Sequence, residues 1–427
     1  MKHILKTLAV ASGLLVGAAT ASFAATEITW WDFLSGGDGV RMKALIADFN
    51  KEHPDIHINA TTSEWGEPFY TKVRTSAAVG QQPDVMTFHL SRVPLAVKEG
   101  VLSDITDEDL ANAGLSKSDY FPRALESATE GGKLKAVPFD VHALVLYYNK
   151  DLLSKAGLLG PDGKPQGIGT IDEFNAALAK LKEQGVETPV SFQTGGEGGT
   201  WRVFYTLLAQ QGGKFMDGNK VLDGDNAAKA QKALAVMTDW VSKGFAPQQA
   251  EYEASVALFS SGKSAFQLNG VWEVPTYTDL AEKKQLGFEW GAIQVPAWMG
   301  QQATWADSHS FAIPQSPQGS ITGEKRKAVM TVIGWMNKHS IRWANAGHIP
   351  AYKPVADSDE FKKMEPNATY SVLAETAVYD PRSNIAGVGG PIYDAALNIM
   401  SPAINGFMTP EEAVTQMQES LGQLAAN

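Results

Sequence analysis

Aromatic and polar side chains recur together at the turns and strand ends of this sequence. Such clusters stand at Trp30-Trp31-Asp32, Glu64-Trp65, Asn269-Gly270-Val271-Trp272 and Trp305-Ala306-Asp307-Ser308-His309, in a chain with 11 tryptophans. A pyranose has C–H faces that stack on aromatic rings, and hydroxyls that need carboxylate, imidazole, amide or guanidinium partners. One hydrogen bond exchanged with water contributes only ~0.5–1.5 kcal/mol, so ring burial must supply much of the affinity. The clusters are therefore typical of a sugar-binding site.

Large aromatic side chains most often pack into protein cores, so each tryptophan is assigned separately. Trp30 is expected in the core of a strand. Trp31 follows it on the opposite face, beside Asp32 and a glycine-rich turn, where packing and ligand contact both stay open. Trp240 and Trp335 lie on apolar helical stripes, and we expect them to be structural.

Other motifs that carry chemistry are incomplete. Gly262-Lys263-Ser264 resembles the end of a phosphate-binding loop, but Ala257 stands where the leading glycine is required. His53 and His57 flank Pro54 and a strand-like pattern, so they share no helical face and no metal site is expected. No Gly-x-Ser-x-Gly elbow occurs. The sequence gives no positive signal for catalysis, and we expect neither an enzyme nor a cofactor.

Strand and helix patterns alternate along the chain. Residues 28–31 read as a strand, apolar residues at 42, 45, 46 and 49 as one helical face, and residues 56–60 as a second strand. Capping boxes at Thr170 and Glu173, and at Thr409 and Glu412, predict two later helix starts. This order is typical of α/β proteins, whose ligands bind beyond the carboxyl ends of strands.

The first 24 residues predict a secretory signal peptide. Lys2 and Lys6 precede an uncharged run, and Ser22-Phe23-Ala24 offers a cleavage point. The apolar run is about twelve residues, short of the ~20 that a membrane helix needs, so no membrane insertion is expected.

Net charge and cysteine content exclude several kinds of partner and covalent link. Loss of Lys2 and Lys6 changes the net charge from −11 to −13, which argues against nucleic-acid binding. The absence of cysteine excludes disulfides and a cysteine lipid anchor. A free periplasmic protein is the simplest interpretation.

Six segments, in order, resemble the family 1 extracellular solute-binding proteins of ATP-driven importers. They are QPDVMTF at 82–88, EGVLSD at 99–104, GKLKAVP at 132–138, YNKDLL at 148–153, NGVW at 269–272 and TPEEA at 409–413. The ordered set spans nearly the whole mature chain. The resemblance implies a two-lobed, hinge-connected type II periplasmic binding protein fold with the ligand cleft between the lobes. One lobe would hold residues 25–138 and 293–342, and the other residues 139–292 and 343–427. A monomer that closes on its ligand and docks on an ABC permease is expected.

The candidate site residues come from the resemblance and from the polar clusters. By position, the resemblance implies ligand contacts for Phe88, Arg92, His142, Trp272 and Tyr393, with Trp201 and Arg202 near a further contact region. Asp140 stands two residues before His142 and points to the same side of a strand. The clusters add Trp31, Asp32, Glu64, Asp307 and His309. A sugar or short oligosaccharide is the expected ligand.

Two alternatives stay open. A secreted carbohydrate-active enzyme would need two carboxylates at catalytic separation, drawn from Glu64, Asp140 and Asp307. The same fold could instead bind a polyamine or a glycerol phosphodiester. Arg92 and Arg202 disfavour a polyamine and suit a phosphodiester.

Overall fold

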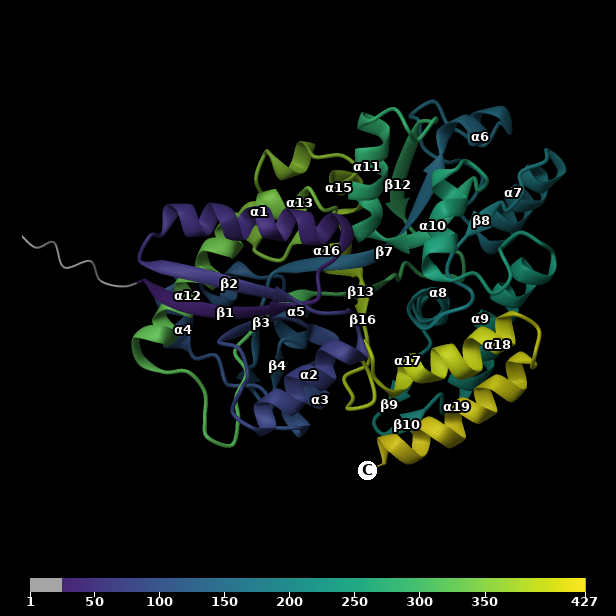
Figure 1. The fold of residues 1–427 in the computed structure, drawn as a ribbon. Coiled ribbons are helices and arrows are strands. Elements are labelled where there is room, and N and C mark those ends of the chain that lie inside the picture. Colours follow the sequence, from purple (N-terminus) through teal and green to yellow (C-terminus); the bar gives the residue numbers. More distant parts are fainter. Residues whose placement is uncertain (1–24, 427) are drawn as a thin grey trace, which may run out of the picture.

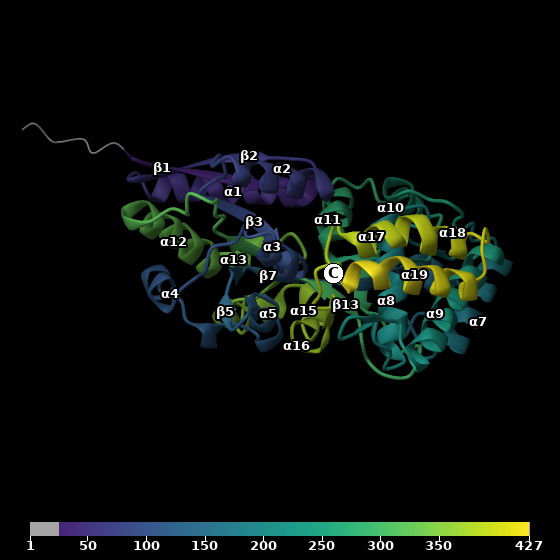
Figure 2. The same ribbon diagram turned by 90° about the horizontal axis from the view of Figure 1, so that it is seen from below.

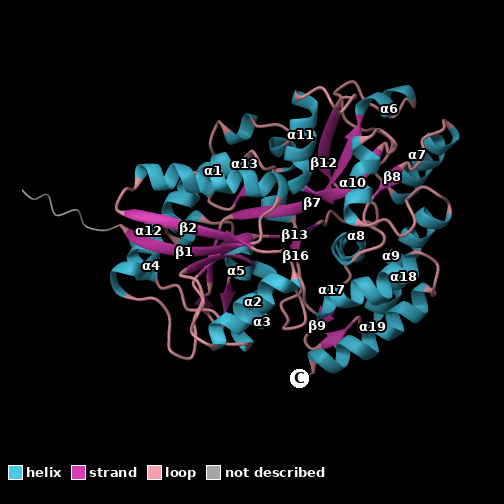
Figure 3. Ribbon diagram, in the orientation of Figure 1, coloured by secondary structure: helices cyan, strands magenta, loops and turns pink. Residues whose placement is uncertain are grey.

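The computed structural model describes residues 25–426 and contains two main β-sheets with helices packed around them (Figures 1 and 3). The signal peptide expected at 1–24 lies outside the described residues. Within residues 25–426, no helix is both long and apolar enough to cross a membrane.

The first sheet has five strands in the order β2-β1-β3-β14-β6. Their bounds are β2 (Ile56–Thr62), β1 (Thr26–Asp32), β3 (Val85–His89), β14 (His309–Ala312) and β6 (Ala136–Pro138). β1 runs parallel to β2 and β3, whereas β14 is antiparallel to β3 and β6. Ile28 and Trp30 of β1 are fully buried, which confirms the core position expected for Trp30.

Helices around this sheet bury the predicted apolar faces. α1 (Gly36–Glu52) buries Met42, Leu45, Ile46 and Phe49. α12 (Gly323–Lys338) lies beside α4 (Asp107–Ala113) in both views (Figures 1 and 2) and buries Trp335. The other helices of this part are α2 (Glu67–Ala78), α3 (Val93–Lys98), α5 (Pro122–Ser127) and α13 (Ser340–Ala344).

The second sheet is built around one long strand, β7 (Asp140–Asn149), in which every residue is buried. Antiparallel strands pair along it: β11 (Phe266–Gly270), β12 (Trp290–Gln294), β13 (Trp305–Asp307) and β15 (Ile349–Pro350). β8 (Val190–Ser191) pairs with β11, and β16 (Val378–Tyr379) with β13.

The helices of this part include both predicted capping boxes. Thr170 caps α7 (Ile171–Glu183) and Thr409 caps α19 (Pro410–Ala425), each with its glutamate partner. The chain ends with α17 (Pro391–Ala395), α18 (Ser401–Ile404) and α19, which pack on α8 and α9 (Figure 1). The remaining larger helices are α6 (Lys150–Lys155), α8 (Glu197–Gln210), α9 (Asp225–Ser242), α10 (Tyr252–Ser260) and α11 (Val274–Glu282). Trp240 on α9 is buried, as expected.

At two points the chain passes between the two sheets across a single residue, and a third, longer passage leads from β14 through α12 and α13 to β15. Phe139 separates β6 from β7, and Ser308 separates β13 from β14. The sequence predicts lobe boundaries at 138/139, 292/293 and 342/343. Because β12 and β13 pair with β7, residues up to 307 lie with the second sheet, so strand pairing puts the second passage at Ser308. Asp140, which follows Phe139, and Asp307 and His309, which flank Ser308, therefore lie where the two sheets join.

Candidate ligand-binding site

A cleft of about 600 Å³ lies at these passages, and its walls come from elements of both sheets. One wall is formed by residues 33–38, Trp65 and His89, and the other by Arg202, Tyr252 and Trp272. His142 of β7 and His309 of β14 line the cleft between these walls. Elements of the two sheets therefore enclose a single site.

Asp32 lies behind the wall formed by residues 33–38 and fixes the backbone there. Its buried carboxylate accepts a hydrogen bond from the Leu34 backbone N–H at 3.0 Å, at the turn that leads from β1 into α1. Burial raises the pKa of Asp32, while that hydrogen bond acts in the opposite direction. The side chain thus holds the 33–38 turn and is not itself part of the cleft lining.

Trp272 presents a half-buried indole on the opposite wall. Its N–H donates to the Tyr252 hydroxyl at 2.7 Å, and that hydroxyl donates to Glu273. A Cβ at Gly270 would lie 2.1 Å from the indole ring, so only glycine leaves room for this ring position. The ring is therefore fixed in place before any ligand arrives.

Arg202 lies among three tryptophan rings. Its guanidinium carbon is 4.6 Å from the ring centroid of Trp272, 4.8 Å from that of Trp305 and 5.8 Å from that of Trp65, distances typical of cation–π contact. Arg202 is 7% exposed and forms no hydrogen bond or ion pair with residues 25–426. Its N–H donors at the cleft are thus without a protein acceptor, and a buried donor of this kind calls for a ligand acceptor.

Four histidines meet beside these walls, and we call them the histidine cluster: His89, His142, His309 and His348. Their ring centroids are 4.3 Å apart for His142 and His309, 5.1 Å for His89 and His309, and 5.3 Å for His309 and His348. His89, His142 and His309 line the cleft, while His348 is fully buried behind them. The cluster draws on β3, β7, β14 and the segment before β15.

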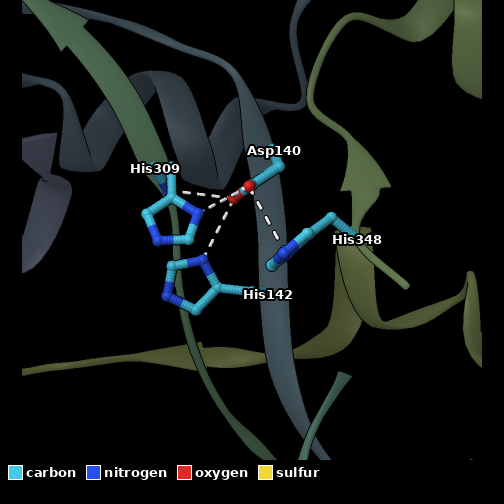
Figure 4. A group of neighbouring side chains, drawn as sticks. All are labelled: Asp140, His142, His309 and His348. Carbon is cyan, nitrogen blue, oxygen red and sulfur yellow. Dashed lines mark hydrogen bonds and ion pairs between the residues drawn. The ribbon is translucent and has the colours of Figure 1, made fainter. Parts of the chain in front are cut away.

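Asp140 organises the cluster (Figure 4). Its fully buried carboxylate receives hydrogen bonds from His142 Nδ1 at 3.0 Å, His309 Nδ1 at 2.8 Å and Trp343 Nε1 at 2.7 Å. Burial opposes ionisation, but the neighbouring His309 and His348 and these hydrogen bonds hold the pKa of Asp140 well below its usual range. An ionised carboxylate only accepts hydrogen bonds, so both imidazoles carry their proton on Nδ1.

Burial and the nearby carboxylates of Asp38 and Asp140 determine the pKa values of His142 and His348. Burial, together with His309, lowers the pKa of His142 to about 3, so that ring is neutral and its Nε2 offers a lone pair to the cleft. Burial acts against the charge of His348 too, but Asp38 and Asp140 outweigh it and raise the pKa of His348. His348 Nε2 lies 3.1 Å from Asp38 and its Nδ1 3.5 Å from Asp140. His348 thus lies between two carboxylates that favour its protonated form.

Of the twelve candidate residues, the structure places His142, Trp272 and His309 on the cleft lining and three carboxylates directly behind it. Asp32 holds the turn, Asp140 orients the imidazoles, and Asp307 accepts hydrogen bonds from Ser91 N at 3.0 Å and Ser91 Oγ at 2.5 Å. Burial raises the pKa of Asp307 to about 6.

The other six candidates lie away from the lining. Phe88 is buried edge-on against Tyr70, Arg92 lies over the same Tyr70 ring, and Trp31 is covered by Lys72. Trp201 donates to Asp380 at 2.8 Å in the core. Tyr393 is fully buried, and Glu64 is exposed.

The cleft also contains residues that were not chosen as candidates. His89 follows Phe88, Trp65 follows Glu64, and Arg202 follows Trp201, so three selections fell one residue short. On β3, successive side chains point to opposite faces, so the step from Phe88 to His89 exchanges core for cleft. Arg202 lies on helix α8 and Trp65 on a loop, where this alternation does not apply. A lone arginine in the nearly all-buried helix α8 was the available signal for Arg202.

Solved structures establish the fold class. The GacH receptor of Streptomyces glaucescens, solved unliganded and with acarbose, matches with a TM-score of 0.80 at 23% identity, over 94% of this chain and 99% of that one. Maltose-bound MalE3 of T. maritima matches with a TM-score of 0.77 at 22% identity, over 94% and 100%. The fold is the two-lobed type II periplasmic binding protein fold, as predicted.

The family follows from the sequence itself. A model of the bacterial extracellular solute-binding proteins matches residues 35–319, and the chain belongs to that family. The galactooligosaccharide-binding protein of Bacillus subtilis is 23% identical over 425 residues, which cover 96% of this chain and 92% of that protein. The mannitol-binding protein of Pseudomonas aeruginosa is 26% identical over 349 residues, which cover 80% and 74%. The predicted resemblance is confirmed.

Proposed function

We propose that this protein is the periplasmic substrate-binding subunit of an ABC importer, which captures a sugar or short oligosaccharide and releases it to a membrane permease. One observation carries the proposal. In a single cleft, a fixed indole face at Trp272 adjoins unpartnered donors of Arg202 and imidazole acceptors of His142 and His309. A pyranose needs this combination of an apolar face and converging polar groups.

The relatives support this ligand class. Proteins similar to this chain are described as binding galactooligosaccharides, mannitol and arabinooligosaccharides. Several solved neighbours are described with bound oligosaccharides such as mannotriose. A polyhydroxylated, neutral ligand is common to these descriptions.

Capture without chemistry fits the positions of the carboxylates considered for catalysis. Asp140 is fully buried and receives hydrogen bonds from imidazoles and an indole, and Asp307 is fully buried against Ser91. Glu64 is exposed and lies outside the cleft lining. None of these three carboxylates lines the cleft, so they supply no acid–base pair for glycoside cleavage there.

Delivery to a permease requires that ligand favour a closed form. The two passages at Phe139 and Ser308 are single residues, and they lie next to the cleft. Ligand contacts from both walls stabilise the closed arrangement over an open one, which shifts the population that the permease meets. The family and the expected signal peptide support a periplasmic monomer.

A second candidate ligand is a glycerol phosphodiester. The unpartnered guanidinium of Arg202 favours an anion, and the sn-glycerol-3-phosphate-binding protein of Yersinia enterocolitica is 25% identical over 253 residues, or 57% of this chain. The acidic residues Glu197, Glu251, Glu253 and Glu273 at the same cleft favour a neutral ligand instead. Affinity that falls steeply with salt would identify the anion.

A thermal-shift screen of residues 25–427 against mono-, di- and trisaccharides, sugar alcohols, polyamines and glycerol phosphodiesters tests the function. A ligand present at 100 times its Kd stabilises the fold by ~2.7 kcal/mol, which raises Tm by a few degrees. We expect a selective response to a sugar or sugar alcohol. A response only to phosphodiesters or polyamines would overturn the ligand class and keep the fold.

A further inference from the structure

Three imidazoles of the histidine cluster point at the carboxylate of Asp140 (Figure 4). His142 Nδ1 lies 3.0 Å from Oδ1, His309 Nδ1 lies 2.8 Å from Oδ2, and His348 Nδ1 lies 3.5 Å from Oδ2. All four side chains are buried. One potential metal-ligand atom from each of the four lies within 4.8 Å of the other three. Three imidazoles and a carboxylate are thus gathered in one group inside the protein.

This group has the composition and spacing of a zinc site. Zinc in proteins binds four ligands at tetrahedral angles, and imidazole nitrogens and carboxylate oxygens are among its usual ligands. Bonds of ~2.0–2.2 Å place neighbouring ligand atoms about 3.4 Å apart. The three nitrogen–oxygen distances to Asp140, from 2.8 to 3.5 Å, include that value. A pair of ligand atoms at the 4.8 Å limit of the group must close by about 1.4 Å, which rotation of a side chain provides.

His348 has one ring nitrogen that its neighbours leave unsatisfied. Its Nε2 lies 3.1 Å from each carboxylate oxygen of Asp38. Its Nδ1 is buried and makes no hydrogen bond within residues 25–426. A histidine that binds a metal through one nitrogen usually donates from the other to a carboxylate, which fixes the tautomer and the ring orientation. A buried polar atom without a partner calls for an explanation, and a metal ion on Nδ1 supplies one.

The other two rings can bind an ion by a shift of their protons. His142 and His309 donate from Nδ1 to Asp140, and both rings line the cleft. A neutral imidazole whose proton moves from Nδ1 to Nε2 presents a lone pair at Nδ1. The proton is then held on the nitrogen that Figure 4 shows on the far side of each ring from Asp140. The cleft also gives an ion its path to the group.

We infer that Asp140, His142, His309 and His348 form a buried binding site for a divalent transition-metal ion such as zinc, in which the histidines bind through Nδ1. Asp38 is the outer-shell carboxylate of His348. Three imidazoles select a transition metal over calcium and magnesium, which prefer oxygen ligands. With four protein ligands the site is closed, as in structural zinc sites.

The position of the site gives the ion a structural role. Asp140 directly follows the passage at Phe139, and His309 directly follows the passage at Ser308. His348 directly precedes β15, at the end of the third passage. One ion therefore ties together all three segments that pass between the sheets, and its binding contributes to the stability of the fold.

The first test titrates residues 25–427, freed of metal by a chelator, with Co²⁺ and follows the visible absorption of the bound ion. We expect one ion per chain, displaced by Zn²⁺, and at least tenfold weaker binding in His348→Ala, which loses a ligand outside the cleft lining. Asp38→Asn changes the outer-shell partner of His348 and should weaken binding by ~10–100-fold. His57 is exposed on β2, so His57→Ala is the matched control and should bind as the unaltered chain does. Circular dichroism checks that each variant is folded.

A second measurement needs no variant. Crystals of the unaltered chain grown with equimolar Zn²⁺ should give an anomalous peak between Asp140 and the three Nδ1 atoms. Equal Co²⁺ binding by the unaltered chain and a folded His348→Ala variant would overturn the inference. So would crystals with no peak, or with a peak only at other side chains. Neither measurement uses a sugar, so the outcome is independent of the proposed function.

Discussion

Asp140 Oδ2 lies 2.8 Å from His309 Nδ1, and this hydrogen bond joins the two segments that pass between the sheets across a single residue. Asp140 is the first residue of β7, directly after the passage at Phe139, and His309 is the first residue of β14, directly after Ser308. The backbone N–H of His309 also donates to Asp140, at 2.9 Å. The cleft histidines are therefore anchored at the point where the lobes connect.

Asp140→Asn should lower the free energy of unfolding by ~3–5 kcal/mol, the usual cost of breaking a buried charge pair. An amide N–H would face donors that now point at a carboxylate, and His348 would lose one of its two neighbouring carboxylates. Urea unfolding measures the change. Asp104→Asn removes a more exposed carboxylate, paired with Lys133 and Lys135, and should cost less than ~1 kcal/mol. A similarly small loss for Asp140→Asn would show that the carboxylate does not organise the cluster.

Trp272→Ala should weaken ligand binding at least tenfold and leave Tm nearly unchanged, because the indole is half-buried on the cleft wall. Titration calorimetry with the ligand from the screen measures the affinity. Trp31→Ala is the matched control: its ring lies under Lys72 outside the cleft lining, so affinity should not change. Equal losses of affinity in the two variants would show that the Trp272 indole does not contact the ligand.

Gly270→Ala should weaken binding about as much as loss of the indole does. The added methyl would lie 2.1 Å from the Trp272 ring, so the ring must move away from the cleft wall. The backbone at Gly270 has φ of −80°, which alanine adopts freely. Any loss of affinity therefore comes from the contact with the Trp272 ring and not from backbone strain. Gly422→Ala on α19 has open space around the methyl and should leave affinity unchanged. Unaltered affinity in Gly270→Ala would mean that the indole position does not matter.

Asp380→Asn should remove a pH dependence of stability between about pH 4 and 7. Burial, with Asp307 nearby, raises the pKa of Asp380 to about 7, while hydrogen bonds from the Trp201 and Trp305 indoles to Oδ1 act in the opposite direction. The folded-state pKa is thus above the unfolded value. The stability linked to the bound proton is full below pH 3.8 and is lost as pH rises through about 7, at up to ~1.4 kcal/mol per pH unit.

Asparagine keeps both indole hydrogen bonds without a charge, so Asp380→Asn should be more stable than the unaltered chain at pH 8 and equal to it at pH 4. Chemical unfolding at the two pH values measures this. Asp307→Asn serves as the contrast, because both oxygens of Asp307 accept hydrogen bonds from Ser91 and an amide loses one of them. A less stable Asp380→Asn at pH 8 would show that burial does not raise the pKa of Asp380.

Local signals made much of the fold predictable. The α1 face, the alternation in β1 and the capping boxes at Thr170 and Thr409 depend on residues a few positions apart, and the structure has all of them. The passage at Ser308 was not predictable from such signals. It depends on whether β13 pairs with β7 or continues into the first sheet, and pairing partners lie far apart in the sequence.

The site was predictable only in part, for the same reason. Trp272 and His309 were predicted from polar and aromatic clusters beside strand ends, and His142 from its position in the family resemblance. All three line the cleft. Phe88 was predicted from its position in the family resemblance, and the sequence alone does not reveal that the next residue, His89, lies on the face of β3 toward the cleft. His348 comes from a late segment whose place behind His142 is set by β15 pairing with β7.

The central claim is that a sugar binds between Trp272, Arg202 and the cleft histidines, and a crystal structure with the ligand identified by the screen tests it most directly. The account predicts a sugar ring stacked on the Trp272 indole, with hydroxyls accepting from the Arg202 guanidinium and donating to the His142 and His309 imidazoles. A ligand bound outside the cleft, or inside it without contact to Trp272 and Arg202, would contradict the account.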